Sequence, residues 1–90
     1  MDKYRFRVVV SIFIFDMRNM RGFGYHSQSE LARGLGVRDA TVSSWVNKES
    51  CISAFTLFCL FSYFASVNRI SLVDVVSRFL DRYSSMIEKE

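Results

Sequence analysis

The stretch that decides the fold is residues 27–47, which read SQSELARGLGVRDATVSSWVN. Ser27 and Glu30 form an S-x-x-E pattern, in which the serine accepts a hydrogen bond from the third backbone N–H of a helix and the glutamate reaches back. A helix is therefore predicted to follow Ser27 and to break around Gly34–Gly36. A second short helix is predicted at about 38–47. The pattern indicates two short helices joined at a glycine.

Several positions in this pair of helices must meet a requirement of size or conformation. Ala32 has to be small because the second helix crosses close above it, and Gly36 lies in the turn, where a positive φ is cheap only for glycine. Apolar residues at the inward positions supply the small core that ties the pair to the rest of the chain: Leu31, Leu35, Val37, Val42 and Trp45. A lone glycine between helices is weak evidence, but agreement at all of these positions predicts a helix-turn-helix.

These residues resemble the lambda-repressor-like helix-turn-helix family, which includes phage Cro and repressor proteins, and LGV-x-x-A-T-V-S-x-W is especially typical of it. The likeness continues more loosely, since ISAFTLFCLFSYF looks like the family's fourth helix and VNRISLVDVV like its link into a fifth. The resemblance implies an all-α fold, a compact bundle of about five helices containing a helix-turn-helix. It also implies one domain over residues 1–90 that binds double-stranded DNA.

The resemblance implies a set of DNA-contacting residues on and beside the second of the two helices. Gln28 resembles a position near a phosphate, and Asn47 and Lys48 resemble contacts to the DNA backbone. The residues that correspond to the face in the major groove are Arg38, Asp39, Ala40, Ser43 and Ser44. Short side chains let a helix backbone approach the bases, and Arg38 is the best candidate for a bidentate bond to a guanine. A solvated or phosphate-bound Arg38 is an equal alternative, as are simple spacers for the two serines.

Three positions depart from the family pattern. Arg38 stands where the family usually has a small N-cap residue. Asp39 therefore either caps the helix instead, which withdraws Asp39 from the bases, or faces the groove. Gly34 stands late in the first of the two helices, where the family often has a longer residue. Ser53 stands near the place of a customary proline.

The helices expected on either side of this pair are strongly apolar. Residues 4–20, YRFRVVVSIFIFDMRNM, fit both helical stripes and a strand of period two; their length and the helices that follow favour a helix, ended by Gly22–Gly24. Residues 50–68 carry no charge and predict a helix at roughly 52–66 that is buried on most sides. The run is just long enough to span a bilayer, but its serines do not share one face, which favours a core helix over a membrane span.

A last helix is predicted from the Ser71-x-x-Asp74 cap onward. Its apolar stripe consists of Leu72, Val76, Phe79, Leu80, Tyr83 and Ile87. Residues 71–88 are therefore expected either to form a dimerisation helix or to pack against the bundle. A homodimer is expected because one recognition helix covers only a few base pairs.

The composition limits the other classes of function. Twelve Lys and Arg against nine Asp and Glu give a net charge of +3, which permits a polyanion partner without requiring one. Cys51 and Cys59 are expected to be reduced, buried thiols, and His26 has no second metal ligand nearby. No catalytic set, metal, cofactor or small-molecule substrate is indicated. With no secretory signal evident, a cytoplasmic location is expected.

The leading hypothesis is a sequence-specific DNA-binding transcriptional regulator, a phage or prophage repressor that binds a near-palindromic operator as a dimer. The alternative is a protein-interaction module of the same fold, such as an antitoxin or the partner of an anti-repressor. A third, weaker alternative is a membrane-tethered regulator that uses residues 50–68. A DNA-selection experiment separates the first two hypotheses.

Overall fold

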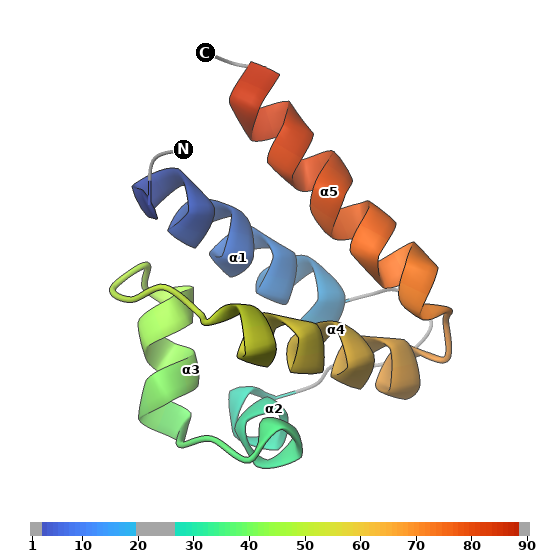
Figure 1. Ribbon diagram of the computed structural model, residues 1–90. Helices are drawn as coiled ribbons and strands as arrows, with labels where there is room; N and C mark the ends of the chain where they lie inside the picture. The colour runs from blue at the N-terminus through green and yellow to red at the C-terminus, as the bar shows by residue number, and fades with distance from the viewer. Residues whose placement is uncertain (1–2, 20–26, 89–90) are drawn as a thin grey trace.

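The computed structural model describes residues 3–19 and 27–88, with side chains up to Ser85. Its five helices are α1 (Lys3–Arg18), α2 (Gln28–Leu35), α3 (Asp39–Val46), α4 (Ala54–Asn68) and α5 (Leu72–Glu88) (Figure 1). The predicted all-α fold is confirmed, and residues 4–18 are helical rather than extended. No strand occurs in the described ranges. The predicted stop at Gly22–Gly24 lies outside the described residues.

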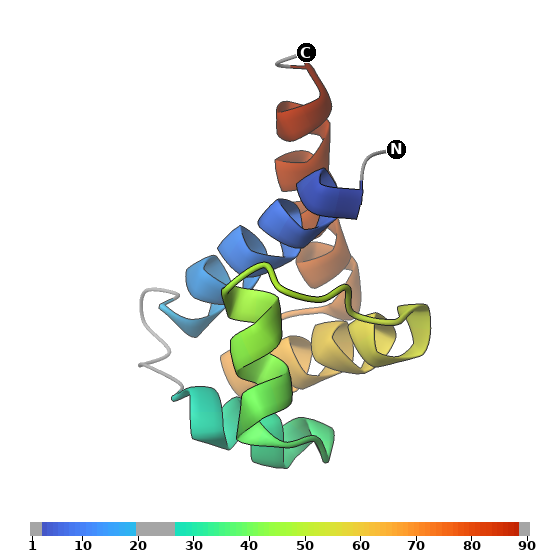
Figure 2. The same cartoon turned by 90° about the vertical axis from the view of Figure 1, so that its left-hand side faces the viewer.

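The helices form one bundle in which the helix-turn-helix lies at one end. α1 packs against α3 and α5, α4 packs against α2 and α5, and α2 and α3 pack against each other. Both views place the beginning of α1 and the end of α5 at the opposite end of the molecule from α2 (Figures 1 and 2). α1 and α5 therefore form a support on which the α2–α3 pair is held through the contact of α1 with α3 and of α4 with α2.

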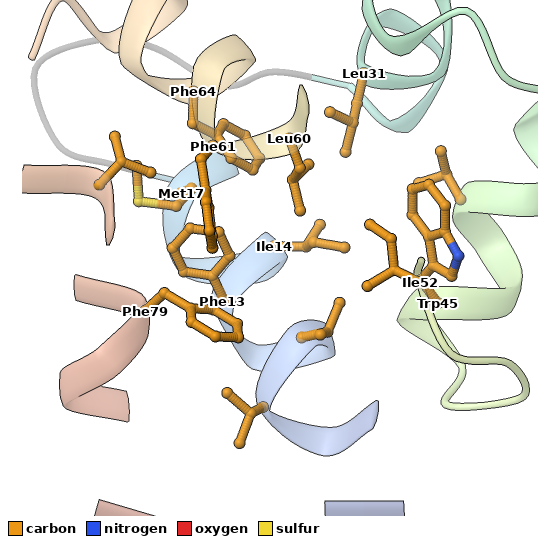
Figure 3. Close-up of a cluster of buried hydrophobic side chains, with 14 of the residues drawn as sticks. Phe13, Ile14, Met17, Leu31, Trp45, Ile52, Leu60, Phe61, Phe64 and Phe79 are labelled. Atoms are coloured by element: carbon orange, nitrogen blue, oxygen red, sulfur yellow. The ribbon is translucent and has the colours of Figure 1, made fainter. Parts of the chain in front are cut away.

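The core is built around the ring of Phe13 in the middle of α1. This ring makes edge-to-face contacts with Phe61, Phe64 and Phe79, with ring centroids 5.7, 5.8 and 5.2 Å away. Such T-shaped pairs are the preferred geometry of aromatic rings because the positive edge of one ring meets the negative face of the other. Figure 3 shows this cluster on one side of Ile14, with Trp45 and Ile52 on the other. The core thus joins α1, α4 and α5 to the helix-turn-helix.

The predicted helix caps are present. Ser27 Oγ accepts a hydrogen bond from the backbone N of Glu30 at 3.1 Å, and Ser71 Oγ accepts one from the backbone N of Asp74 at 3.0 Å. Gly36 ends α2 in the left-handed conformation, with φ of 71°. Each of these contacts satisfies backbone groups that the end of a helix leaves without a partner.

The bounds of α4 differ from the prediction. The helix begins at Ala54 rather than near 52, because Ser53 is its N-cap and accepts a hydrogen bond from the backbone N of Thr56 at 3.2 Å. Ile52 therefore lies in the connection before the helix, where it is buried beside Trp45 (Figure 3). The serine in place of the family's proline thus has a structural role as a cap.

The prediction that this apolar helix is buried on most sides needs a correction on one face, where Phe55, Phe58, Ser62 and Ser66 are exposed. Its buried residues are Leu60, Phe61, Phe64 and Asn68, which share one face. On the opposite face, the side chains of Phe55 and Phe58 are 79% and 60% exposed. The physical reason is that α4 packs against α2 and α5 and, through Phe61 and Phe64, against Phe13 of α1, which leaves one face at the surface.

The apolar stripe predicted for α5 is divided between core and surface. Phe79 is buried as expected, but Leu80 is 52% exposed, and Val75, which lies outside the predicted stripe, is fully buried. Among the described residues, no helix taken singly has the length and apolar composition needed to cross a membrane; α4 and α5 meet that criterion only together, and the pair is bent by 120°.

Both cysteines are free thiols, but the prediction that they are buried is wrong. Cys51 is exposed in the connection between α3 and α4, where Arg7 Nε donates a hydrogen bond to its Sγ at 3.3 Å, and Cys59 is half-buried on α4. In the connection Ile52 takes the core position and Cys51 is left exposed, and Cys59 is near the outward face of α4.

Candidate nucleic-acid interface

The inner face of the α2–α3 pair forms as the sequence predicted. Leu31 and Ala32 of α2 are buried, and so are Val42 and Trp45 of α3. Leu35 and Val37 are partly buried against the same core. Because Val42 and Trp45 are three residues apart, they occupy one side of α3 and fix which side faces away.

The side of α3 that faces away from the core carries only short side chains. The helical spacing places Ala40, Ser43, Ser44 and Asn47 there, opposite Val42 and Trp45. Ala40 and Asn47 are exposed, and the two serines are half-buried. These four residues are called the outer face of α3 below. A backbone with such short side chains can approach the floor of a DNA groove closely.

The start of α3 resolves the choice between Arg38 and Asp39 as the cap. Arg38 occupies the N-cap position with φ of −80° and ψ of 153°, but its side chain makes no capping hydrogen bond. Asp39 is the first helical residue, and its Oδ2 accepts a hydrogen bond from Ser29 Oγ at 3.1 Å. Asp39 therefore joins the beginning of α2 to the beginning of α3 instead of capping its own helix.

This contact also brings the predicted site residues of the two helices together. Gln28 is the first residue of α2 and is half-buried, directly before Ser29 in the chain. Arg38, Asp39 and Ala40 are all exposed at the beginning of α3. The N-terminal ends of both helices, whose backbone N–H groups favour negative charge, thus lie at one place on the surface.

At the other end of α3 the predicted residues bond to each other and to the loop. Ser44 Oγ donates to the carbonyl oxygen of Thr41 at 2.7 Å and lies 2.6 Å from Ser50 Oγ. Asn47 Nδ2 donates to Ser43 Oγ at 3.2 Å. The hydroxyl of Ser44 is thus engaged within the protein, which leaves it the weakest of the predicted base contacts.

Lys48 follows α3 in the left-handed conformation, with φ of 62°. For a residue with a Cβ, the left-handed conformation is less stable by roughly 1–2 kcal/mol. The backbone N of Lys48 donates a hydrogen bond to the carbonyl oxygen of Trp45 at 3.2 Å, which closes the end of α3. The half-buried Lys48 therefore sits at the tight turn beside Asn47, where both were predicted to contact the DNA backbone.

A hydroxyl group of α1 holds the last turn of α3. Ser11 Oγ donates a hydrogen bond to the carbonyl oxygen of Val46 at 2.6 Å, across 35 positions in the sequence. This carbonyl is one of those that the end of a helix leaves unpaired. Ser11 was not among the residues predicted from the sequence, and its place as a serine inside an otherwise apolar stretch was the one signal that could have marked it.

The departure at Gly34 is explained by Tyr63 of α4. A Cβ atom at Gly34 would lie 2.2 Å from Cε2 of the Tyr63 ring, far inside van der Waals contact. Burial, with the nearby negative charge of Glu30 as a smaller cause, raises the pKa of Tyr63 above its ordinary value of 10.0. The missing side chain in α2 therefore makes room for the aromatic ring of α4, which sets how closely the two helices pack.

The helix-turn-helix itself carries no net charge. Residues 27–50 contain equal numbers of basic and acidic side chains: Arg33, Arg38 and Lys48 against Glu30, Asp39 and Glu49. The surplus of +3 therefore comes from the rest of the chain. Within residues 3–19 and 27–88, no three His, Cys, Asp or Glu side chains gather closely enough to hold a metal ion.

Comparison with known families agrees with this geometry. The family model described as helix-turn-helix, of the Cro and repressor type, matches residues 24–64, just under half of the chain. This confirms the resemblance seen in the sequence, and it supports a DNA-binding transcriptional regulator with double-stranded DNA as its partner. No curated protein and no solved structure matched the chain.

Proposed function

We propose that the protein is a sequence-specific repressor of transcription, of phage or prophage type, that inserts α3 into the major groove of its operator. The observation that carries the proposal is the division of α3 into two sides. Val42 and Trp45 are buried in the core, while the outer face of α3 carries only short side chains. A helix fixed on one side and thin on the other suits entry into a groove.

Each predicted site residue has a proposed role. Arg38 is the long side chain at the edge of a thin face, and it is proposed to read a guanine with its guanidinium group. Asp39 accepts from Ser29 Oγ, and a carboxylate held in this way is suited to accept a hydrogen bond from the amino group of a cytosine. Ala40 and Ser43 are proposed to let the backbone approach the bases.

The remaining residues are proposed to position the helix. Gln28 at the start of α2 and the pair Asn47 and Lys48 at the end of α3 lie at opposite ends of the proposed interface. Contacts of this kind to phosphates fix register without carrying sequence information. Ser44 is assigned to the same group, since its hydroxyl is engaged with Thr41 and Ser50.

One recognition helix reads only a few base pairs, so the repressor is proposed to bind as a dimer. Two copies would place their α3 helices in successive major grooves of one side of the duplex, about 34 Å apart. The operator is then expected to be near-palindromic, because a two-fold axis of the protein relates the two half-sites.

The proposal is tested by selecting binding sites from random duplexes at moderate salt. The expected result is a near-palindromic motif whose half-sites are separated by about one helical turn. Ala40→Glu puts a long acidic side chain on the outer face of α3 without touching the core, and it should abolish enrichment. Ala54→Glu is the matched control, since Ala54 is also exposed but lies at the start of α4. A library that returns no motif with the unmodified protein would contradict the proposal and favour a protein-interaction module of this fold.

A further inference from the structure

The positive charge of the molecule is concentrated on α1. Of the five helices, α1 alone carries a net positive charge, since a single acid, Asp16, stands against four basic residues: Lys3, Arg5, Arg7 and Arg18. The net charge of this helix, +3, equals that of the whole chain. Residues 27–50 are neutral, so the helix-turn-helix has no net attraction for the phosphates of DNA. The electrostatic attraction that drives nonspecific binding to DNA is therefore expected to come from α1.

Three of these basic residues lie on one side of α1. Lys3, Arg7 and Arg18 recur at helical spacing, with Ser11 between them, so their side chains share one side of the helix. This side faces the end of α3, because Ser11 Oγ donates its hydrogen bond to the carbonyl oxygen of Val46. These three residues are called the basic side of α1 below.

The basic side of α1 lies beside the connection from α3 to α4. Arg7 Nε donates a hydrogen bond to Cys51 Sγ at 3.3 Å, and the same sulfur lies 4.0 Å from the carbonyl oxygen of Lys3. Toward the other end of the helix, Arg18 and Lys48 line one cleft between α1 and the end of α3. Figure 2 shows α1 and this connection next to the end of α3. The basic side of α1 thus continues the surface on which Lys48 was predicted to contact the DNA backbone.

The side chains on this surface suit the phosphates of a DNA strand. Arg18 and Lys48 are both half-buried, and long basic side chains in such positions lay their alkyl stems on apolar surface while their charged groups reach water. An anion placed between two neighbouring cations is attracted by both and offsets their mutual repulsion. Arg7 uses Nε in its bond to the connection, and the guanidinium group has further N–H donors that can bond to a phosphate oxygen.

We infer that α1 supplies the main phosphate contacts of this protein, with Arg7 and Arg18 holding the DNA strand that passes the end of α3 beside Lys48. The inference rests on the proposed function, because a helix inserted in the major groove lies between the two phosphate backbones. The neutral helix-turn-helix then reads the bases, and α1 provides the affinity that depends on salt. Residues 24–64 match the family model, so α1 lies outside the matched segment.

The basic residues of α5 are less suitable for this role. Arg82 forms an ion pair with Asp16, and Arg78 lines the same groove as Asp81, so the charge there is balanced. Both views place α5 on the far side of α1 from α3 (Figures 1 and 2). A duplex seated on α3 therefore does not reach Arg78, which is exposed and makes a matched control.

Titrations at several salt concentrations test the inference with two duplexes, the selected operator and a scrambled duplex of the same length. Arg7→Gln and Arg18→Gln should each weaken binding to both duplexes by the same factor, because a phosphate contact carries no sequence information. Each should make the slope of log K against log salt less steep by about 0.9 per copy, or about 2 per dimer. Arg78→Gln removes the same charge from α5 and should leave the slope unchanged.

Lysine substitutions separate a phosphate contact from a structural role. Arg7→Lys removes the Nε donor that bonds to Cys51 but keeps the positive charge, so it should keep the salt dependence that Arg7→Gln loses. Arg18→Lys should behave in the same way. An unchanged slope in Arg7→Gln or in Arg18→Gln would overturn the inference. Equal losses in the lysine and glutamine variants would overturn it as well, since they would show that the arginines act through the fold.

The proposed function fails by a different result. If site selection returns no motif, sequence-specific reading by α3 is contradicted, yet the slope measured on the scrambled duplex still tests the contacts of Arg7 and Arg18. If a motif is enriched and the glutamine variants keep the slope of the unmodified protein, the role of α1 is overturned and the repressor proposal stands.

Discussion

The residues of the proposed interface divide by what their side chains already contact. Ser44, Ser43 and Asn47 bond within the protein, and Asp39 bonds to Ser29. Arg38 is exposed at the N-cap position and makes no capping hydrogen bond. Arg38 therefore carries most of the base recognition that this face is proposed to perform.

Replacing Arg38 with alanine should remove the preference for guanine at one position of each half-site. The expected loss is about 1–3 kcal/mol per half-site on the selected operator, because a bidentate contact to a base is of this size. Fluorescence anisotropy with the operator and with a duplex changed at that base pair measures it. Arg33→Ala is the control, which should weaken both duplexes equally. If the Arg38→Ala protein keeps the preference for guanine, the proposal that Arg38 reads that base is wrong.

Gly34 and Tyr63 form the second residue-scale test. Gly34→Ala should destabilise the fold. Overpacking usually costs about 1–3 kcal/mol, and the higher helix propensity of alanine offsets about 1 kcal/mol of that cost. The clash is with the Tyr63 ring, so in a Tyr63→Ala background the same change should be neutral or stabilising. Urea unfolding of the four chains measures this cycle. Equal destabilisation in both backgrounds would refute the pairing.

At the scale of elements, α3 is held along its inner side and at both ends. Val42 and Trp45 anchor it to the core, Asp39 joins its beginning to Ser29, and Ser11 bonds its last turn. A recognition helix held in this way loses little conformational freedom when it binds, which favours affinity.

The bond from Ser11 has a measurable consequence. Ser11→Ala should cost about 1–3 kcal/mol of stability, because the carbonyl oxygen of Val46 would be left without its partner next to α1. Amide hydrogen exchange should rise in the last turn of α3 more than in α2. Ser62→Ala, on the outward face of α4, should change neither quantity. Unchanged exchange in α3 would show that the last turn is held by other contacts.

Helix positions were largely predictable because their signals are local. Ser27, Ser71 and Gly36 act as sequence spacing predicted, within a few residues of the groups they cap. The turns at Lys48 and Arg69 were not predictable, since both residues are in the left-handed conformation without being glycine. Backbone hydrogen bonds close both turns, from Lys48 N to the Trp45 carbonyl oxygen and from Arg69 N to that of Ser66.

At the scale of the whole molecule, the sequence predicted the five-helix architecture and the inner face of the helix-turn-helix. It did not predict which face of α4 reaches the surface, because apolar residues such as Phe55 and Phe61 occupy both sides of that helix. It also did not predict contacts between distant segments, such as Gly34 with Tyr63. Periodicity separates an inner from an outer face only where the outer face is polar.

The balanced charge of residues 27–50 predicts that this segment contributes modestly to the dependence of DNA affinity on salt. Arg33, Arg38 and Lys48 are the basic residues available in this segment. When Arg7 and Arg18 are both replaced by glutamine, a dimer that uses two or three basic residues of the segment per copy should show a slope of log K against log salt of roughly −4 to −5. Operator titrations of this double variant at several salt concentrations measure the slope. A slope near −10 would mean that other basic residues outside this segment bind the phosphates.

The most direct test of the central claim is backbone amide NMR during titration with the selected operator and with a scrambled duplex of the same length. With the operator, the largest shift changes should fall on residues 38–48 and on Gln28 and Ser29 at the start of α2. The scrambled duplex should cause smaller changes at the same places. Changes confined to α4 and α5, or equal changes with both duplexes, would contradict a sequence-specific reading of DNA by α3.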